Sequence, residues 1–355
     1  MMYWRPRARS PIGIDVSGRY LHAVQLQRAN GGWRLAAAGR YERANPESEL
    51  SANEVRLFSE LLERQGFTGR DVTLAVPGEL LKSDLLELPA AASGLALEQL
   101  ARMEMARTHK CLPDSFELTI WPLPSSGRST DGQHVMAAAC THPESERLLE
   151  VWESGGLCVS ALDVHASVVA RVIQSRMTQQ PHISAALDLT WDAARLVIFL
   201  ENTVIYDRTL ADGGLHLLNK TLVERLDVDS EVADFAIFQV GFGEILKAEW
   251  KNWPLLTDAR GIMATHFTSM LDELRVSFSY AQHRYPDIPV DRLFLMGWGA
   301  TVPGLAEPLE SMLGIETQLI TPSCTIDTPV DSRVALQDPG FTLATGLALF
   351  EESGC

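Results

Sequence analysis

The chain has no stretch of eighteen uncharged apolar residues, which is about the length that a helix needs to cross a bilayer. Its five cysteines are scattered and form no CxxC pair, which argues against a zinc site or a disulfide framework and favours a reducing compartment. The first ten residues carry three arginines but no apolar segment follows them, so no signal peptide is expected. The nine histidines lack the spacing of a metal-binding helix face. These absences predict a cytoplasmic protein with no membrane span, disulfide or metal site of its own.

Positive charge is also scarce: the chain has 30 Lys and Arg residues and 46 Asp and Glu residues, which gives a formal net charge of −16. Such a surface repels nucleic-acid phosphates and suits basic segments of other proteins. The chain has 355 residues, which is long for one core and predicts two domains. A hydrophobic content of 46% with 21% charged residues is typical of a folded globular protein.

What the sequence does contain is a pattern that occurs twice. In the first copy an apolar run, 12–16, carries Asp15 near its end, Ser17–Arg19 are turn residues, and 21–26 alternates between two faces. A further turn leads into 33–41, so the pattern predicts three strands joined by tight turns. A carboxylate beside the backbone amides of a turn can hold a metal-bound polyphosphate, although the same residues also occur in an ordinary meander.

The second copy begins at 185–189, where Asp188 again lies near the end of an apolar run. Thr190, Trp191 and Asp192 form the turn, and strands at 194–200 and 203–209 follow. Two such units predict an internal duplication at the scale of domains. If the two turns faced each other across a cleft, they would hold the phosphates of a nucleotide from both sides.

The remaining pattern predicts an α/β chain whose first half contains an extra sheet. Short apolar runs predict strands at 71–76, 116–123, 134–140, 159–162 and 291–296. Apolar residues at helical spacing predict helices at 54–65, 95–108, 143–154, 165–179, 265–282, 303–313 and 341–351. We therefore expect a first domain at 1–165 with an inserted module at about 76–163, a second domain at 166–330, and a C-terminal segment, 331–355, whose helix returns to the first domain.

Several of these segments together resemble a known family. They are GIDV around Asp15, ALDL around Asp188, the Gly213–Gly214 pair, and the stretches 76–89, 97–113, 161–164, 291–315 and 343–349. In this order they resemble the actin-like nucleotide-binding fold and, within it, the PilM-type type IV pilus assembly proteins, which are relatives of the cell-division protein FtsA. The resemblance implies a two-domain actin-like (ribonuclease H-like) α/β fold with a small α+β module inserted in domain one.

The resemblance also implies a site for ATP with Mg²⁺. By position, the first phosphate loop would contain Asp15, Ser17, Gly18, Arg19 and Tyr20, and the second would contain Asp188, Thr190, Trp191 and Asp192. The double glycine, Gly213 and Gly214, follows the second meander, and the adenosine loop would contain Gly297, Trp298, Gly299 and Ala300.

The chain departs from the family pattern at most of these places. Ser17, Thr190 and Trp298 stand where the family prefers glycine, and His22, Leu218, Asp234 and Ile237 replace polar or charged family residues near the ligand. Glycine lets the backbone approach a phosphate closely and adopt positive φ. The substitutions therefore predict weak or lost ATP binding and no catalytic residue, so catalysis is not favoured. The alternative is that Trp298 stacks on the adenine.

The family is cytoplasmic and docks the tail of a PilN-like inner-membrane protein, so the resemblance implies a scaffold held at the membrane by its partners. Glu104 and Arg107, three residues apart on a predicted helix, form either a surface ion pair or a contact with that tail. A nucleotide-controlled, FtsA-like protein is the alternative function. A small-molecule kinase is less well supported, because no acidic residue except Asp188 is placed as a base.

Overall fold

The computed structural model describes residues 9–29, 32–89, 94–125, 132–177, 182–243, 254–326 and 334–351. Some of the predicted features lie outside these described residues. They are two of the three N-terminal arginines and parts of the predicted module, of the helix at 165–179 and of the C-terminal segment. Among the described residues, no helix is both long and apolar enough to cross a membrane.

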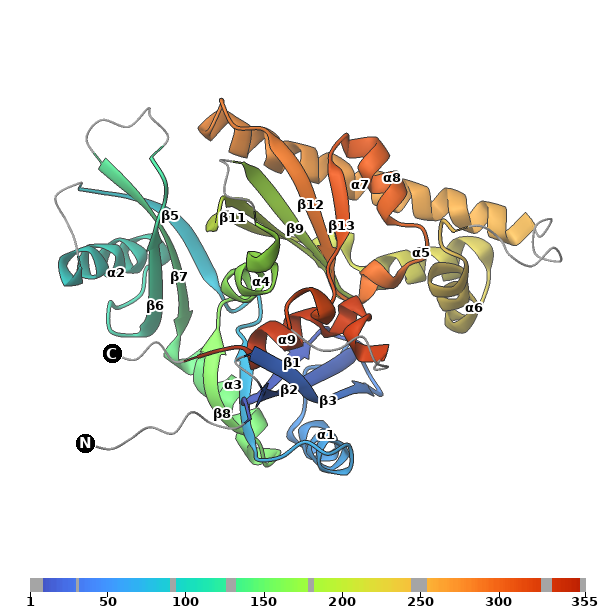
Figure 1. Cartoon of the computed structure of the whole chain (residues 1–355), viewed down its shortest axis with the longest axis horizontal. Helices are drawn as coiled ribbons and strands as arrows, with labels where there is room; N and C mark the ends of the chain where they lie inside the picture. The colour runs from blue at the N-terminus through green and yellow to red at the C-terminus, as the bar shows by residue number, and fades with distance from the viewer. Residues whose placement is uncertain are drawn as a thin grey trace.

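One five-stranded sheet contains the first meander and carries Asp15. Its order is β3–β2–β1–β4–β8, with bounds Gly32–Glu42, Tyr20–Ala29, Ile12–Val16, Asp71–Ala75 and Cys158–Asp163. The first three strands are antiparallel, whereas β4 and β8 run parallel to β1. Helices α1 (Ala52–Arg64) and α3 (His142–Ser154) cover one face, where Phe58 and Trp152 are buried (Figure 1). The predicted meander is confirmed.

A second five-stranded sheet has the same arrangement and carries Asp188. Its order is β11–β10–β9–β12–β13, with bounds Thr203–Leu210, Ala194–Leu200, Ile183–Leu189, Val290–Met296 and Glu316–Leu319. The meander β9–β10–β11 is antiparallel, and β12 and β13 are parallel to β9. Every residue of β9 is buried, because helices cover both faces of this sheet. The repeated sequence pattern therefore corresponds to a repeated sheet topology.

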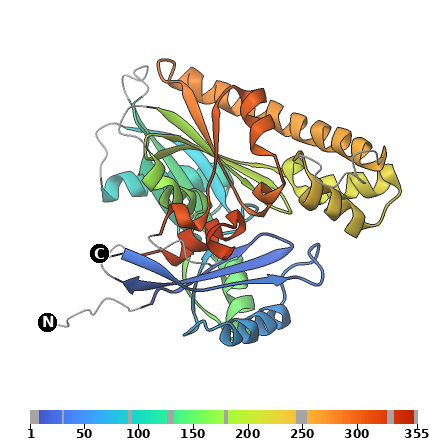
Figure 2. The same ribbon diagram turned by 45° about the vertical axis from the view of Figure 1, so that its right-hand side comes forward.

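Two helices cross between the sheets. Helix α4 (His165–Ile173) packs on the second sheet, and α9 (Thr342–Ala348) packs on β1 (Figure 2). Glycines allow this close packing: a Cβ on Gly13 would lie 2.1 Å from the Ala344 carbonyl oxygen, and a Cβ on Gly346 would lie 2.6 Å from Val172 Cγ1. The strands β1 and β9 are thereby tied to a common central layer.

The helices of the second half complete its core. They are α5 (Leu215–Leu226), α6 (Ser230–Phe235) with a π-helical turn at Ala236–Val240, α7 (Pro254–Arg284) and α8 (Ala306–Leu313). Phe267, Leu271, Leu274 and Phe278 of α7 are buried, as their helical spacing predicted. Figure 1 shows α7 running along this half of the molecule.

The inserted part forms a separate three-stranded sheet beside the second half (Figure 1). Strands β5 (Lys82–Pro89), β7 (Gly132–Thr141) and β6 (Phe116–Pro122) pair in that order, and α2 (Leu95–His109) covers one face. Trp121 Nε1 of β6 donates to the Val204 carbonyl of β11 at 2.8 Å, which attaches the module to the second half.

The predicted module, 76–163, divides between two sheets. Strand β8 pairs with β4, and α3 packs on α1, so both belong with the first sheet rather than with β5–β7. We propose that the module proper is 82–141, inserted in a first domain at 1–165, with a second domain at 166–330 and a C-terminal segment at 331–355.

Candidate nucleotide-binding cleft

Three turns from the two halves meet in the region between the two five-stranded sheets, here named the cleft. They follow β1, β9 and β12, and they contain the residues that the resemblance assigned to nucleotide binding. A Cβ on Gly18 would lie only 2.0 Å from Asp192 Oδ2, so the first and second turns touch. The rings of Tyr20 and Trp298 are 4.6 Å apart, which joins the first turn to the third.

Two backbone amides of the first turn form hydrogen bonds within the turn itself. Gly18 has a φ of +69°, a conformation that side chains disfavour, whereas Ser17 adopts an ordinary one. The Ser17 amide and hydroxyl both donate to the Tyr20 carbonyl, at 3.0 and 3.2 Å, and the Arg19 amide donates to the Ser17 carbonyl. These two amides are therefore engaged inside the turn.

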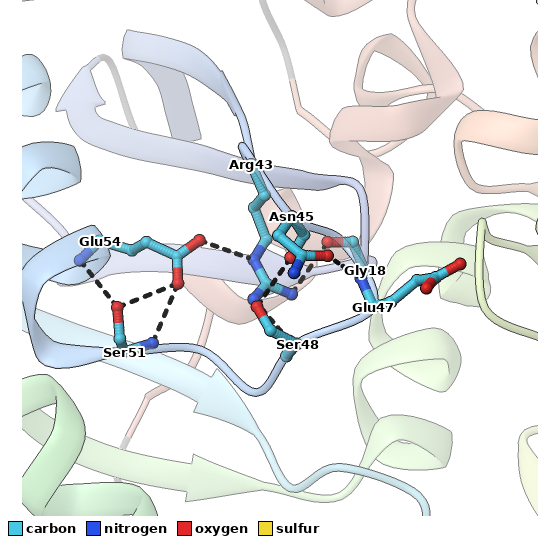
Figure 3. Close-up of polar contacts among 7 residues, drawn as sticks. All are labelled: Gly18, Arg43, Asn45, Glu47, Ser48, Ser51 and Glu54. Carbon is cyan, nitrogen blue, oxygen red and sulfur yellow. Dashed lines mark hydrogen bonds and ion pairs between the residues drawn. The ribbon is translucent and has the colours of Figure 1, made fainter. Parts of the chain in front are cut away.

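Arg43 fixes this turn from behind, a role that the sequence did not reveal. Its buried guanidinium donates to the carbonyls of Gly18 and Ser48, at 3.2 and 2.7 Å, and to Glu54 Oε1 at 3.3 Å (Figure 3). Glu54 also accepts from the Ser51 amide in a capping box that begins α1. The turn is thus anchored to a helix of the first half.

The second turn is closed in the same way. The Thr190 amide donates to the Ala193 carbonyl at 3.0 Å. The amides of Leu215 and His216 at the start of α5 donate to the carbonyls of Thr190 and Trp191, at 3.2 and 2.9 Å. A helix start is a common anion site because its amides are free, and here the turn itself occupies those two amides. Gly213 and Gly214 permit this contact, because a Cβ on Gly214 would lie 2.3 Å from the Asp192 carbonyl oxygen.

The two aspartates lie close enough to influence each other. Burial is the largest cause of a pKa for Asp15 well above its usual value, and the charges of Asp188 and Asp192 raise it further, whereas Arg195 lowers it. Asp188 is buried beside His165, whose Nε2 lies 2.8 Å from Asp188 Oδ2. Burial is the largest cause of a lowered pKa for His165, and the charge of Arg195 lowers it further, whereas the hydrogen bond to Asp188 raises it. The predicted pair of aspartates is therefore brought together at the cleft.

His22, which the resemblance placed where the family has a lysine, supplies no positive charge. Its ring is fully buried and packs edge-on against Phe341 at 4.9 Å. Burial, with a smaller effect of Arg40, lowers the pKa of His22 to about 3. Its Nδ1 lies 4.0 Å from Asp15 Oδ2, so a neutral ring lies beside this carboxylate.

Aromatic rings fill the part of the cleft that the resemblance assigned to adenosine. The Trp298 ring lies 4.0 Å from Phe238, 4.6 Å from Tyr20 and 6.2 Å from Trp191, measured between centroids. Trp191 and Trp298 are each only 8% exposed. The indole of Trp298 therefore packs edge-on or tilted against other rings, and Gly297, Gly299 and Ala300 form the turn that places it.

Arg19 crosses the cleft. Its guanidinium carbon lies 4.9 Å from the Trp191 ring and 5.7 Å from the Trp298 ring, and its terminal nitrogens pair with Asp234 at 2.5 Å and Glu42 at 2.9 Å. Asp234 was recognised in the sequence only as a departure from the family pattern. Its pairing with a residue 215 positions away could not be read from either segment alone.

These residues fit ATP with Mg²⁺ poorly. A nucleotide held by the family loops needs free backbone amides at the turns and an open slot for the base. Here the amides of Ser17, Arg19, Leu215 and His216 are engaged within the protein, and buried indoles occupy the place that the resemblance assigned to adenosine.

Glu104 and Arg107 lie on α2 of the module, away from the cleft (Figure 1). They pair with each other, with Arg107 Nε 3.0 Å from Glu104 Oε2. The Arg107 side chain is 73% exposed. Their role as contacts for a partner stays a prediction.

Two sheets of matching topology, two helices crossed between them and three turns around a cleft define the actin-like nucleotide-binding fold. The ethanolamine utilization protein EutJ from Carboxydothermus hydrogenoformans is similar, with a TM-score of 0.54 and 14% identity over 98% of this chain and 91% of that one. An MreB protein of Spiroplasma citri bound to ADP has a TM-score of 0.52 and 11% identity over 98% of both chains.

The family model for the type IV pilus assembly protein PilM matches residues 13–352, and this chain belongs to that family. A solved chain of a PilM–PilN type IV pilus biogenesis complex is similar in fold, with a TM-score of 0.76 and 20% identity over 97% of this chain and 98% of that one. A comparison with curated proteins finds no match.

Proposed function

We propose that the protein is a cytoplasmic scaffold of a type IV pilus or related secretion machine, held at the inner membrane by the cytoplasmic tail of a PilN-like protein. Membership of the PilM family over residues 13–352 is the observation that carries this proposal. The similar solved chain comes from a PilM–PilN complex, which supports a PilN-like partner here.

The docking site is the first domain with its module. Strands β5 and β6 are the outer strands of the module sheet and, among the described residues, each pairs only with β7. Such an edge can accept an extended peptide as an added strand. Leu85 on β5 is 38% exposed, and Glu104 and Arg107 lie on the neighbouring helix. The net charge of −16 suits a tail with Lys or Arg near the membrane.

Two point variants, one on an edge strand of the module and one on an edge strand of the second sheet, test this docking site. Leu85→Asp places a charge on the outer strand of the module, and Leu319→Asp does the same on β13, the outer strand of the second sheet, where Leu319 is 43% exposed. Affinity for a peptide of the tail, measured by calorimetry, should fall at least about tenfold for Leu85→Asp, since that change corresponds to about 1.4 kcal/mol. Leu319→Asp should bind as the wild type does. Equal binding by both variants would contradict the module as the site.

A deletion provides a second test. Lys82 pairs with Ala139 at the base of the module, so the two ends of 82–141 are close and a short Gly-Ser linker can join 81 to 142. This variant should retain both five-stranded sheets and lose the partner in a pull-down. Asp188→Ala, in the cleft, should retain it. Loss of the partner by a folded Asp188→Ala variant would instead favour control by nucleotide.

Weak or absent ATP binding is the second part of the proposal. The engaged amides and the aromatic rings at the assigned adenosine position support it. A ligand whose concentration is far below its Kd does not stabilise a protein measurably. Millimolar Mg-ATP should therefore leave the melting temperature unchanged. A clear rise at micromolar ATP would favour the FtsA-like alternative, in which Trp298 stacks on the base.

A further inference from the structure

The cleft contains a contact network made from both halves of the molecule. Arg19 and Tyr20 come from the turn after β1, whereas Trp191, Trp298 and Asp234 belong to the second half. All three rings are at most 8% exposed. The network therefore occupies the interface between the two halves, at the place that the resemblance assigned to the nucleotide.

Both ends of the Arg19 contact are held in place. On the second half, Asp234 Oδ1 accepts from Asn219 Nδ2 at 2.7 Å, and the buried Asn219 also donates to the Ser230 carbonyl at 3.2 Å. On the first half, Glu42 Oε1 accepts from Arg19 Nε at 3.0 Å. A carboxylate and a guanidinium that are fixed before they meet lose little side-chain freedom on pairing.

We propose that Arg19, with the rings of Tyr20, Trp191 and Trp298, acts as an internal ligand that holds the two halves closed without a nucleotide. The guanidinium supplies positive charge opposite Asp234 and a flat surface against the indoles. The rings supply the buried apolar area that a base would otherwise contribute.

Carboxylates of the two halves also lie close together at the cleft. Asp15 of the first half lies near Asp188 and Asp192 of the second, and repulsion from these two carboxylates adds to burial in raising the pKa of Asp15. The Arg19–Asp234 pair, by contrast, joins opposite charges across the cleft. The inference goes beyond the scaffold role, because it concerns how the halves are held together and holds whether or not the tail binds the module.

The distance between the halves provides the test. Spin labels on a non-natural amino acid at Glu60 of α1 and Glu224 of α5, both exposed, avoid the native cysteines and report this distance in the full chain. The labelled wild type without nucleotide should give one narrow distance distribution. Arg19→Ala and Asp234→Ala should each broaden it toward longer distances, and the double variant should open no further than either single one, because both remove the same contact.

Arg208→Ala is the matched control, because Arg208 pairs with Glu273 at 3.1 Å entirely within the second half. It should retain the wild-type distribution. If Arg19→Ala does not fold, Asp234→Ala and Arg19→Lys replace it in the test. Arg19→Lys keeps the positive charge and loses the contact of the planar guanidinium with the indoles. Wild-type distributions for folded Arg19 and Asp234 variants would overturn the proposal, and so would a broad wild-type distribution that Mg-ATP narrows. Tail binding by the same variants is measured separately, so failure of the scaffold proposal would be recognised independently.

Discussion

His22 is a fully buried imidazole under the first turn, and it makes stability depend on pH. Its pKa is lowered to about 3 in the folded protein, against about 6.5 in an unfolded chain. The ring is therefore neutral when folded, and its contribution to stability is present above pH 6.5 and is lost as the pH falls from 6.5 toward 3. Between pH 7 and 5 the wild type should lose about 2 kcal/mol more stability than His22→Gln.

Urea unfolding of both proteins at pH 7, 6 and 5 measures this difference. Asp15 lies 4.0 Å away and has the opposite sign: because its pKa is raised, its contribution is lost as the pH rises. Comparing the wild type with His22→Gln separates the two, since both proteins retain Asp15. Parallel pH profiles for the two proteins would show that His22 is not neutral in the fold.

At the same scale, the sequence could predict some of the cleft and not the rest. Asp15 and Asp188 each lie in a short local pattern of apolar run, carboxylate and turn, so they were found without a structure. Arg43 and the Arg19–Asp234 pair depend on contacts between segments distant in the chain. No local spacing encodes such contacts. The same holds for Phe238, which completes the ring cluster around Trp298.

Among elements, the contact of β1 with α9 leaves no room for a side chain. A Cβ on Gly13 would lie 2.1 Å from the Ala344 carbonyl oxygen and 2.3 Å from the Ala348 amide nitrogen, both backbone atoms that cannot turn away. Gly13→Ala should therefore destabilise the protein by about 3 kcal/mol, at the upper end of overpacking effects, and move α9 away from the sheet. Thermal and urea unfolding measure the loss.

Gly261→Ala is the matched control for this substitution. Gly261 lies inside α7, and an added Cβ there meets no atom within 4 Å. Alanine should raise stability by up to about 1 kcal/mol, because it favours the helix more than glycine does. A Gly13→Ala variant as stable as the wild type would contradict the packing of α9 on β1.

The sequence predicted helices and strands correctly where the spacing of apolar residues within the segment was sufficient. The helix expected at 95–108 is α2 at Leu95–His109, and the strand expected at 291–296 is β12 at Val290–Met296. The sequence did not indicate which sheet each strand joins. Strand β8 pairs with β4 across more than eighty residues, and a one-dimensional pattern contains no information about that partner.

For the molecule as a whole, the repeated topology and the net charge have different consequences. The duplication places two similar sheets around the α4–α9 layer, and the turns after β1 and β9 then meet because they occupy equivalent positions. The charge of −16 belongs to the whole surface and acts on partners from a distance. The fold thus determines the cleft, whereas the charge affects how fast a basic tail arrives.

Association with a basic tail should consequently be fast and sensitive to salt. Electrostatic attraction raises association rates above the neutral range of about 10⁵–10⁶ M⁻¹s⁻¹, and the Debye length falls from about 10 Å at 0.1 M salt to about 3 Å at 1 M. We expect the association rate of a tail peptide, measured by stopped flow, to fall about tenfold between 0.05 and 0.5 M NaCl, while its dissociation rate changes little. A peptide with its Lys and Arg replaced by Gln should associate slowly at both salt concentrations. If the basic peptide associates equally fast at both, the acidic surface of this chain plays no part in capturing its partner, and recognition depends on the module surface alone.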